Sequence, residues 1–169
     1  MEILKEFHGA ETVQLKGDLR IAGPDILKLN FEWHDVDGEI VFPKSPDSGR
    51  HFNLWQQTCF EAFVQLQSGE YFEINLSPNG AWNVYRFDSY RSPQPPQEYS
   101  GAELLESSFT SGKIEARFLI PGSDLKKIKA GLTAVLLLSN TRTTYWATKH
   151  SGPKPDFHLS ENFNLERNL

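Results

Sequence analysis

Cysteine is nearly absent from this sequence, and long apolar runs are absent altogether. The single cysteine, Cys59, leaves the chain without a disulfide. A domain of 169 residues needs none, because it buries about 70% of the surface that its unfolded chain exposes. The longest apolar stretch, Leu132 to Leu138, is far shorter than the roughly 20 residues that span a bilayer. We therefore expect one domain, residues 1–169, without a membrane-spanning helix.

Basic residues are also scarce, since 17 Lys and Arg face 22 Asp and Glu and the formal net charge is -5. Nucleic acids and anionic membranes are normally bound by a basic surface, so we expect neither as a partner. The first residues lack the apolar stretch of about 7 to 15 residues that a secretory signal contains, which predicts a cytoplasmic location. Nothing in the sequence indicates an oligomeric state.

Apolar and polar residues alternate with period two through much of the chain, the pattern of half-buried strands. Ile26–Trp33 and Ile114–Ile120 alternate most regularly, and the apolar run that ends at Leu138 is typical of a buried central strand. Only Ser123–Ile128 has a helical signal. The sequence therefore predicts an all-β fold, an antiparallel β-sandwich with at most one or two short helical turns. Shorter candidate strands are Val13–Leu15, Leu19–Ile21, Thr143–Ala147 and Asn162–Leu165.

The middle of the chain predicts a hairpin. Thr58–Leu66 and Tyr71–Ser77 alternate cleanly, and the Asn79-Gly80 pair that follows is typical of a two-residue type I′ turn. That turn sets Glu73 opposite Arg86 on the face away from the core. We call this surface the polar face, and its predicted members are Cys59, Glu61, Gln65, Glu73, Asn75, Trp82 and Arg86.

Two interpretations of the polar face remain open. A solvated sheet surface with a Glu73–Arg86 ion pair is the simpler one. The other is a sugar site, because exposed indoles at Trp55 and Trp82 stack on the apolar face of a sugar ring while carboxylate, amide and guanidinium groups bind its hydroxyls.

Three long connections, residues 43–53, 89–97 and 149–160, are surface loops or parts of a binding site. The last of them follows Trp146 and contains His150, Asp156 and His158. Two histidines and a carboxylate are a metal-ligand set. Alternatively, Asp156 bonds to the backbone of its own loop and the imidazoles line a binding cleft.

The runs LWQQTCFEAFVQ, YFEINLSPNGAWNVYRFDSYR, YWATKH and PDFH resemble small bacterial proteins with a DOMON-like fold, related to the family 9 carbohydrate-binding modules. The resemblance covers roughly residues 50 to 165. It implies a β-sandwich in which two tryptophans hold the reducing end of a sugar chain over a concave sheet. Trp55 and Trp146 resemble the tryptophan pair, with Trp82 as the alternative partner, while Glu61 and Arg86 resemble polar residues of that site.

Other DOMON-like proteins resemble b-type cytochromes, whose haem is held by Met and His. The only methionine here is Met1, which argues against that ligand set and leaves only bis-His ligation for a haem. Structural calcium is the other option that the resemblance implies, although the sequence has no compact acidic loop. We expect no cofactor. The histidines available for a haem are His8, His34, His51, His150 and His158.

Familiar catalytic motifs are missing, including G-x-S-x-G, the P-loop, H-E-x-x-H and the Rossmann fingerprint. Glu61 and Glu73 have the residue types of a glycosidase pair, but the predicted ion pair with Arg86 would keep Glu73 ionised. We therefore predict a non-catalytic domain that binds a small molecule, a saccharide, on a concave sheet face. The alternative is a metal-dependent enzyme, or a metal- or haem-binding domain, that uses His150, Asp156 and His158. The predicted ligand-binding residues are Trp55, Glu61, Glu73, Asn75, Trp82, Arg86, Trp146, His150, Asp156 and His158.

Overall fold

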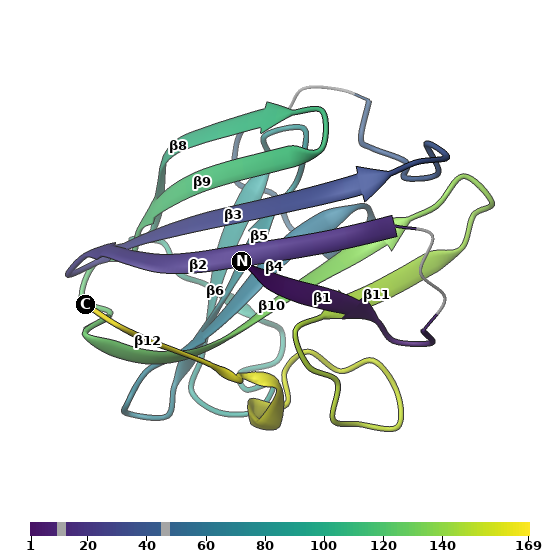
Figure 1. Cartoon of the computed structure of the whole chain (residues 1–169). Coiled ribbons are helices and arrows are strands. Elements are labelled where there is room, and N and C mark those ends of the chain that lie inside the picture. The colour runs from purple at the N-terminus through teal and green to yellow at the C-terminus, as the bar shows by residue number, and fades with distance from the viewer. Residues whose placement is uncertain (10–12, 45–47) are drawn as a thin grey trace.

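The computed structural model describes residues 1–9, 13–44 and 48–169, and it confirms the predicted all-β antiparallel fold (Figure 1). Within those residues the only helical elements are two single 3-10 turns, η1 (Leu54–Gln56) and η2 (Ser160–Asn162). None of the described residues belongs to a helix with the length and hydropathy needed to cross a membrane. The strands are β1 (Glu2–Glu6), β2 (Val13–Gly23), β3 (Ile26–Asp35), β4 (Cys59–Gln65), β5 (Tyr71–Leu76), β6 (Trp82–Phe87), β7 (Gln97–Glu98), β8 (Glu103–Thr110), β9 (Lys113–Leu119), β10 (Lys127–Leu137), β11 (Thr143–Ala147) and β12 (Leu165–Asn168).

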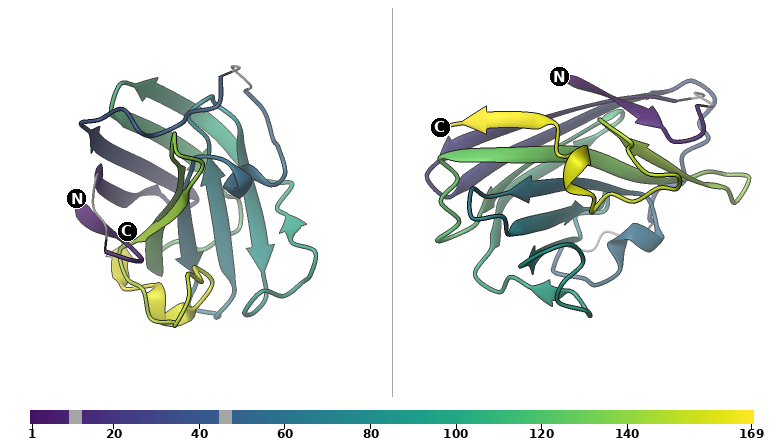
Figure 2. Two further views of the ribbon diagram at one scale, coloured as in Figure 1. Left: turned by 90° about the vertical axis from the view of Figure 1, so that its right-hand side faces the viewer. Right: turned by 90° about the horizontal axis from the view of Figure 1, so that it is seen from below.

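The strands form one curled antiparallel sheet that folds into two layers (Figure 2). The first layer contains β1, β2, β3, β9 and β8 in that order, and the second contains β7, β6, β5, β4, β10 and β11, with β12 paired to β10. Strand β1 joins the layers, since Glu2 to Leu4 pair with β2 while Lys5 and Glu6 pair with β11. The sandwich is therefore closed by hydrogen bonds along one side.

The main core lies between the layers and follows from the alternation in the sequence. Leu27, Leu29 and Phe31 of β3 are fully buried, as are Phe60, Ala62 and Val64 of β4, in agreement with the alternation predicted for Thr58–Leu66. Gly17 of β2 permits a close approach of the layers, because a Cβ there would lie 2.9 Å from Leu132 Cδ1. The two predicted strands on either side of Gly17 are one continuous strand, β2.

The opposite face of the second layer is buried as well, although alternation normally leaves that face to solvent. Every residue of β5 is buried, and so is every residue of β4 except Gln65. Aromatic side chains from the C-terminal segment, among them Phe157 and Phe163, pack on Phe63 and Tyr71 and form a second apolar cluster. This face is therefore covered by loops.

The predicted type I′ hairpin is wrong by one residue. Leu76 pairs with Trp82 and Glu73 with Tyr85, and the loop between β5 and β6 closes with the Ser77 N–H donating to the Ala81 carbonyl. In this loop only Gly80 takes a positive φ, 99°, whereas a type I′ turn needs positive φ at both central residues. The arrangement suits Pro78, whose φ is fixed near −65°. A one-residue shift reverses which face a side chain occupies, so Trp82 and Arg86 belong to the inward face and leave the polar face.

Two other local predictions differ from the structure. Ser123–Ile128 is not helical, because Asp124 takes a left-handed φ of 41° and β10 already begins at Lys127. Residues Asn162–Leu165 are mostly a connection, since η2 ends at Asn162 and β12 begins at Leu165. In the predicted 43–53 loop, positions 45–47 lie outside the described residues.

Candidate ligand-binding cleft

A cavity of about 310 Å³ opens on the covered face of the second layer. Its floor comes from β4, β5 and β10, and its walls come from η1, β11 and the segments after β6 and β11. Two of the long loops noted in the sequence, residues 89–97 and 149–160, therefore contribute to one site. The residues that line the cavity are Trp55, Glu61, Phe63, Glu73, Arg91, Gln94, Pro96, Val135, Tyr145, Pro155, Phe157 and His158.

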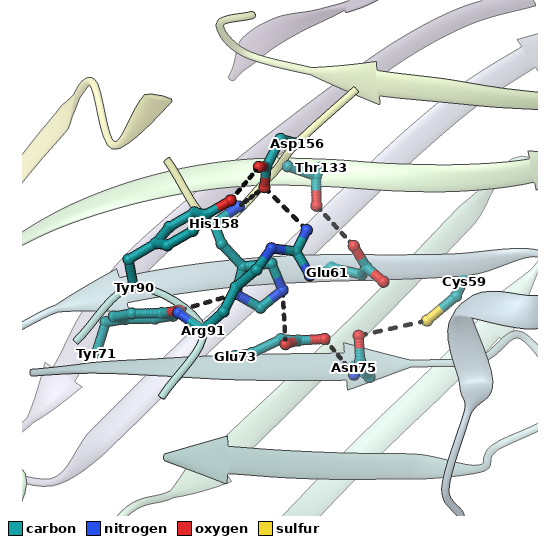
Figure 3. Close-up of polar contacts among 10 residues, drawn as sticks. All are labelled: Cys59, Glu61, Tyr71, Glu73, Asn75, Tyr90, Arg91, Thr133, Asp156 and His158. Atoms are coloured by element: carbon teal, nitrogen blue, oxygen red, sulfur yellow. Dashed lines mark hydrogen bonds and ion pairs between the residues drawn. The ribbon is translucent and has the colours of Figure 1, made fainter. Parts of the chain in front are cut away.

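Two buried carboxyl groups lie at the floor of the cleft (Figure 3). Glu61 pairs with Asn75 and Phe63 pairs with Glu73, so the two glutamates are diagonal neighbours on one face of β4 and β5. Their exposed fractions are only 2% and 5%. Thr133 Oγ1 donates to Glu61 Oε2 at 2.9 Å, and Asn75 Nδ2 donates to Glu73 Oε1 at 3.0 Å. The strand register thus brings the two carboxyl groups together, and a hydrogen-bonding neighbour holds each of them in place.

Burial raises the pKa of both carboxyl groups, because the charged form loses its hydration. The negative charge of Glu73 raises the pKa of Glu61 further, and the hydrogen bond from Thr133 opposes this only in part. The pKa of Glu73 rises from 4.5 to about 7. The pair therefore retains a proton near neutral pH that two surface glutamates would have released.

His158 extends the polar floor from the opposite wall. The backbone N–H of Arg91 donates to the Tyr71 hydroxyl at 3.1 Å, and that hydroxyl shares a hydrogen bond with His158 Nδ1 at 2.8 Å. The other ring nitrogen, Nε2, faces Glu73 Oε2 at 3.6 Å. Burial and the nearby Arg91 charge lower the pKa of His158 to about 4, which keeps the ring neutral at neutral pH.

An ion pair fastens the two wall segments to each other. Arg91 donates to Asp156 Oδ1 at 2.9 Å, and the Tyr90 hydroxyl donates to Asp156 Oδ2 at 2.6 Å. Burial alone would raise the pKa of Asp156, but the hydrogen bonds from Tyr90 and Arg91 outweigh it and hold that pKa below its ordinary value. The backbone N–H of His158 also donates to Asp156 Oδ1. Asp156 therefore positions both Arg91 and His158 at the cleft.

Aromatic rings form much of the remaining wall. Trp55 stands edge-on to Tyr85 at 5.9 Å between ring centroids, and Phe157 lies 6.2 Å from Tyr145 and 6.3 Å from Phe63. Trp55 and Tyr145 are only partly buried, so they keep ring surface free for a ligand. The cleft thus combines a polar, hydrogen-bonding floor with apolar, planar walls.

The structure brings six of the ten predicted ligand-binding residues to this region. Trp55, Glu61, Glu73 and His158 line the cavity, while Asn75 supports Glu73 and Asp156 supports Arg91.

Three other predicted residues have a different position from the one we expected. Trp146 is 2% exposed and lies in the core between the layers, where its Nε1 donates to Thr144 Oγ1. Trp82 packs against the same core with Arg50 over its ring, because the corrected register turns it inward. Arg86 pairs with Glu70 at the sheet margin, and the expected Glu73–Arg86 ion pair is wrong.

The predicted metal set of His150, Asp156 and His158 is not assembled. His150 Nε2 bonds to the Lys5 carbonyl at 2.9 Å, Asp156 is bound by Arg91, and His158 Nδ1 is bound by Tyr71. Within residues 1–9, 13–44 and 48–169, no cluster of three or more His, Cys, Asp or Glu side chains has a geometry suited to a metal ion. The positional reason is that His150 faces Phe7 and Phe157 at the rim and not the floor.

Sequence reasoning missed Arg91, Gln94 and Tyr145. Tyr145 carried a signal, because it neighbours Trp146 in a strand and must face the opposite side from it. Arg91 and Gln94 lie in a Pro-rich loop, where no periodicity indicates which side chain points into a cleft.

The sequence matches no known protein family, and no curated protein is significantly similar to it. Among solved structures, the fold is similar to that of a candidate carbohydrate-binding protein from Bacteroides uniformis ATCC 8492, with a TM-score of 0.64 and 12% sequence identity. The match covers 99% of this chain and 86% of that one. At such low identity the likeness shows a shared fold and nothing about the ligand.

Proposed function

We propose that the cleft binds a saccharide without transforming it. The observation that carries the proposal is the juxtaposition of a partly exposed indole, Trp55, with a floor of carboxyl groups, Glu61 and Glu73. Sugars present an apolar ring face to such aromatic walls and a set of hydroxyls to such acceptors. The cavity volume of about 310 Å³ is at the lower end for small-molecule sites, which favours a ligand of few rings.

The proposal extends to this chain the ligand class suggested for the Bacteroides protein of similar fold, a candidate carbohydrate-binding protein. The resemblance to family 9 carbohydrate-binding modules points to the reducing end of the sugar. In this chain Trp55 and Tyr145 are the partly buried aromatic residues available to hold the ring, since Trp146 is enclosed in the core.

Hydrolysis is less well supported than binding. Glycosidases place their two carboxyl groups on either side of the scissile bond. Glu61 and Glu73 instead project from neighbouring strands of one sheet face, so both lie beneath the ligand. This arrangement suits recognition of adjacent hydroxyl groups.

The test is a titration of tryptophan fluorescence with reducing mono- and disaccharides and with their borohydride-reduced alditols. Trp33, Trp82 and Trp146 belong to the core between the layers, so a change in emission on binding reports Trp55. We expect saturable quenching by reducing sugars and none by the alditols. Binding of alditols with equal affinity would contradict the reducing-end assignment.

Calorimetry with Trp55→Ala and Phe52→Ala separates the site from the surface around it. Phe52 is a 62% exposed aromatic residue close to Trp55 in the chain, but it does not line the cavity. Trp55→Ala should abolish sugar binding, whereas Phe52→Ala should bind like the unmodified protein. If Trp55→Ala binds normally while folded, the cleft is not the sugar site.

A further inference from the structure

The charges around the cleft are unbalanced in a way that a neutral sugar would leave unchanged. Glu61 and Glu73 are both almost fully buried at its floor. The cation that lines the cavity, Arg91, is already bound to Asp156 at 2.9 Å. His158 is neutral at neutral pH, because burial lowers its pKa to about 4. Arg91 acts on Glu73 only through its charge, which lowers the pKa of Glu73 less than burial raises it. Among the described residues that line the cavity, no cation therefore forms an ion pair of its own with either carboxyl group at neutral pH.

One carboxylate oxygen of Glu61 is open to the cavity. Thr133 donates to Oε2, whereas the other oxygen, Oε1, is not one of the buried unpaired atoms among the described residues. The side chain is nevertheless 2% exposed and lines the cavity. Hydrogen bonds to a carboxylate oxygen are charge-assisted, so a ligand that places an N–H donor at Oε1 gains a strong interaction.

The walls favour a positive charge as well. The π faces of Trp and Tyr attract cations electrostatically, and Trp55, Tyr145 and Phe157 surround the same cavity. A group that carries both a positive charge and several N–H donors would bind Glu61 Oε1 and the rings together. A protonated primary amine has these properties.

We propose that the cleft selects an amino sugar, with its ammonium group placed between Glu61 and Glu73 and its ring against Trp55. This inference rests on the proposed saccharide function and specifies its substrate class. Neutral sugars of the same ring geometry bind more weakly, because they leave the buried carboxyl groups uncompensated.

Proton release on binding distinguishes an amino sugar from a neutral sugar. Burial raises the pKa of both glutamates, so the pair holds a proton that an incoming ammonium displaces. Affinity for the amine therefore rises as the pH rises through the raised pKa values of about 7 for Glu73 and about 8 for Glu61, whereas a neutral sugar that accepts a hydrogen bond from a protonated glutamate shows the opposite trend.

Other groups near the pair contribute little to that proton release. Burial raises the pKa of Tyr71 and Tyr85 to about 12, and His158 has already lost its proton below this range. Burial also raises the pKa of Cys59 well above its ordinary value, while hydrogen bonds keep the pKa of Asp156 low. The titratable groups that face the pair from neighbouring elements are Cys59, Tyr71, Tyr85, Arg91, Tyr145, Asp156 and His158.

The experiment is isothermal titration calorimetry with matched sugars: glucosamine, N-acetylglucosamine and glucose, and the corresponding galactose series. Measurements in two buffers of different ionisation enthalpy give the number of protons released. We expect the amine to bind about tenfold or more tightly than its neutral counterparts, a difference of about 1.4 kcal/mol, with net proton release. Glu61→Gln and Glu73→Gln should lose this preference together with the proton release.

Glu70→Gln is the matched control, because Glu70 lies in the loop between β4 and β5 and pairs with Arg86 outside the cavity. It should keep the preference for the amine. Equal affinities for amine and neutral sugar would overturn the inference and leave the saccharide function intact. Absence of binding by every sugar, in a protein shown to be folded by circular dichroism, would overturn both.

Discussion

Replacement of Glu73 by glutamine tests whether burial at the floor of the cleft raises the pKa of this carboxyl group. The change keeps the side-chain volume and the acceptor for Asn75 Nδ2, which donates to Glu73 Oε1 at 3.0 Å, but removes the ionisable group. Because burial raises the pKa of Glu73 in the folded protein, the unmodified protein is most stable where this carboxyl is protonated. Its contribution is complete below about pH 4.5 and is lost as the pH rises through about 7.

The size of the effect follows from the shift in pKa. A rise from 4.5 to about 7 corresponds, at about 1.36 kcal/mol for each pH unit, to about 3 kcal/mol. Glu73→Gln cannot ionise, so it should match the unmodified protein within about 1 kcal/mol near pH 5 and be more stable by about 3 kcal/mol near pH 8.

Urea denaturation at the two pH values measures the free energy of unfolding directly. Comparison at equal pH cancels the opposite contribution of His158, whose lowered pKa makes both proteins gain stability as the pH rises through about 4 to 6.5. Glu106→Gln is the charge control, because its 61% exposed side chain makes only a surface ion pair with Arg117. If Glu73→Gln is instead the less stable protein near pH 8, Glu73 is a stabilised carboxylate and the reasoning fails.

Three further substitutions test the fold and the support of the cleft. Trp82 packs inward, so Trp82→Ala should lower the free energy of unfolding in urea by about 3 kcal/mol. Its sugar affinity in calorimetry should change less than about twofold. Lost binding at unchanged stability would contradict the observed register. Gly17→Ala should cost about 1 to 3 kcal/mol by the same assay, since its Cβ would lie 2.9 Å from Leu132 Cδ1, and a neutral result would mean that the layers can separate locally. Tyr71→Phe removes the hydroxyl that bonds to His158 Nδ1 at 2.8 Å, so thermal unfolding should show a loss of stability of about 1 kcal/mol. Calorimetry should show a weaker sugar affinity. Unchanged affinity would mean that His158 does not depend on this hydrogen bond for its position.

The strands that alternate regularly could be predicted from the sequence with their faces. Phe60, Ala62 and Val64 point inward and Glu61 and Glu73 point outward as the period-two pattern requires. The sequence did not indicate that the outward face would be covered. That covering depends on Phe157 and Phe163, which lie almost 100 residues further along the chain than β4 and have no local signal.

The errors at Trp82 and Arg86 come from one residue of register. Asn79-Gly80 has the composition of a two-residue turn, and only the φ values show that Pro78 and Gly80 form a longer one. The shift by one residue places Tyr85 opposite Glu73 in place of Arg86, and it turns Trp82 toward the core. Trp55 and His158 were identified without any register, Trp55 as a stacking indole that the family resemblance also indicated and His158 as an imidazole in the 149–160 loop.

Strand β1 has a consequence for the order in which the protein is built. Lys5 pairs with Ala147, so the two layers join only after more than 140 residues of chain have been synthesised. The floor glutamates leave the ribosome well before His158 and Phe157 complete the wall above them. A nascent chain that has not yet reached Phe157 and His158 therefore leaves the floor glutamates uncovered, and the cleft can form only after that segment has been added.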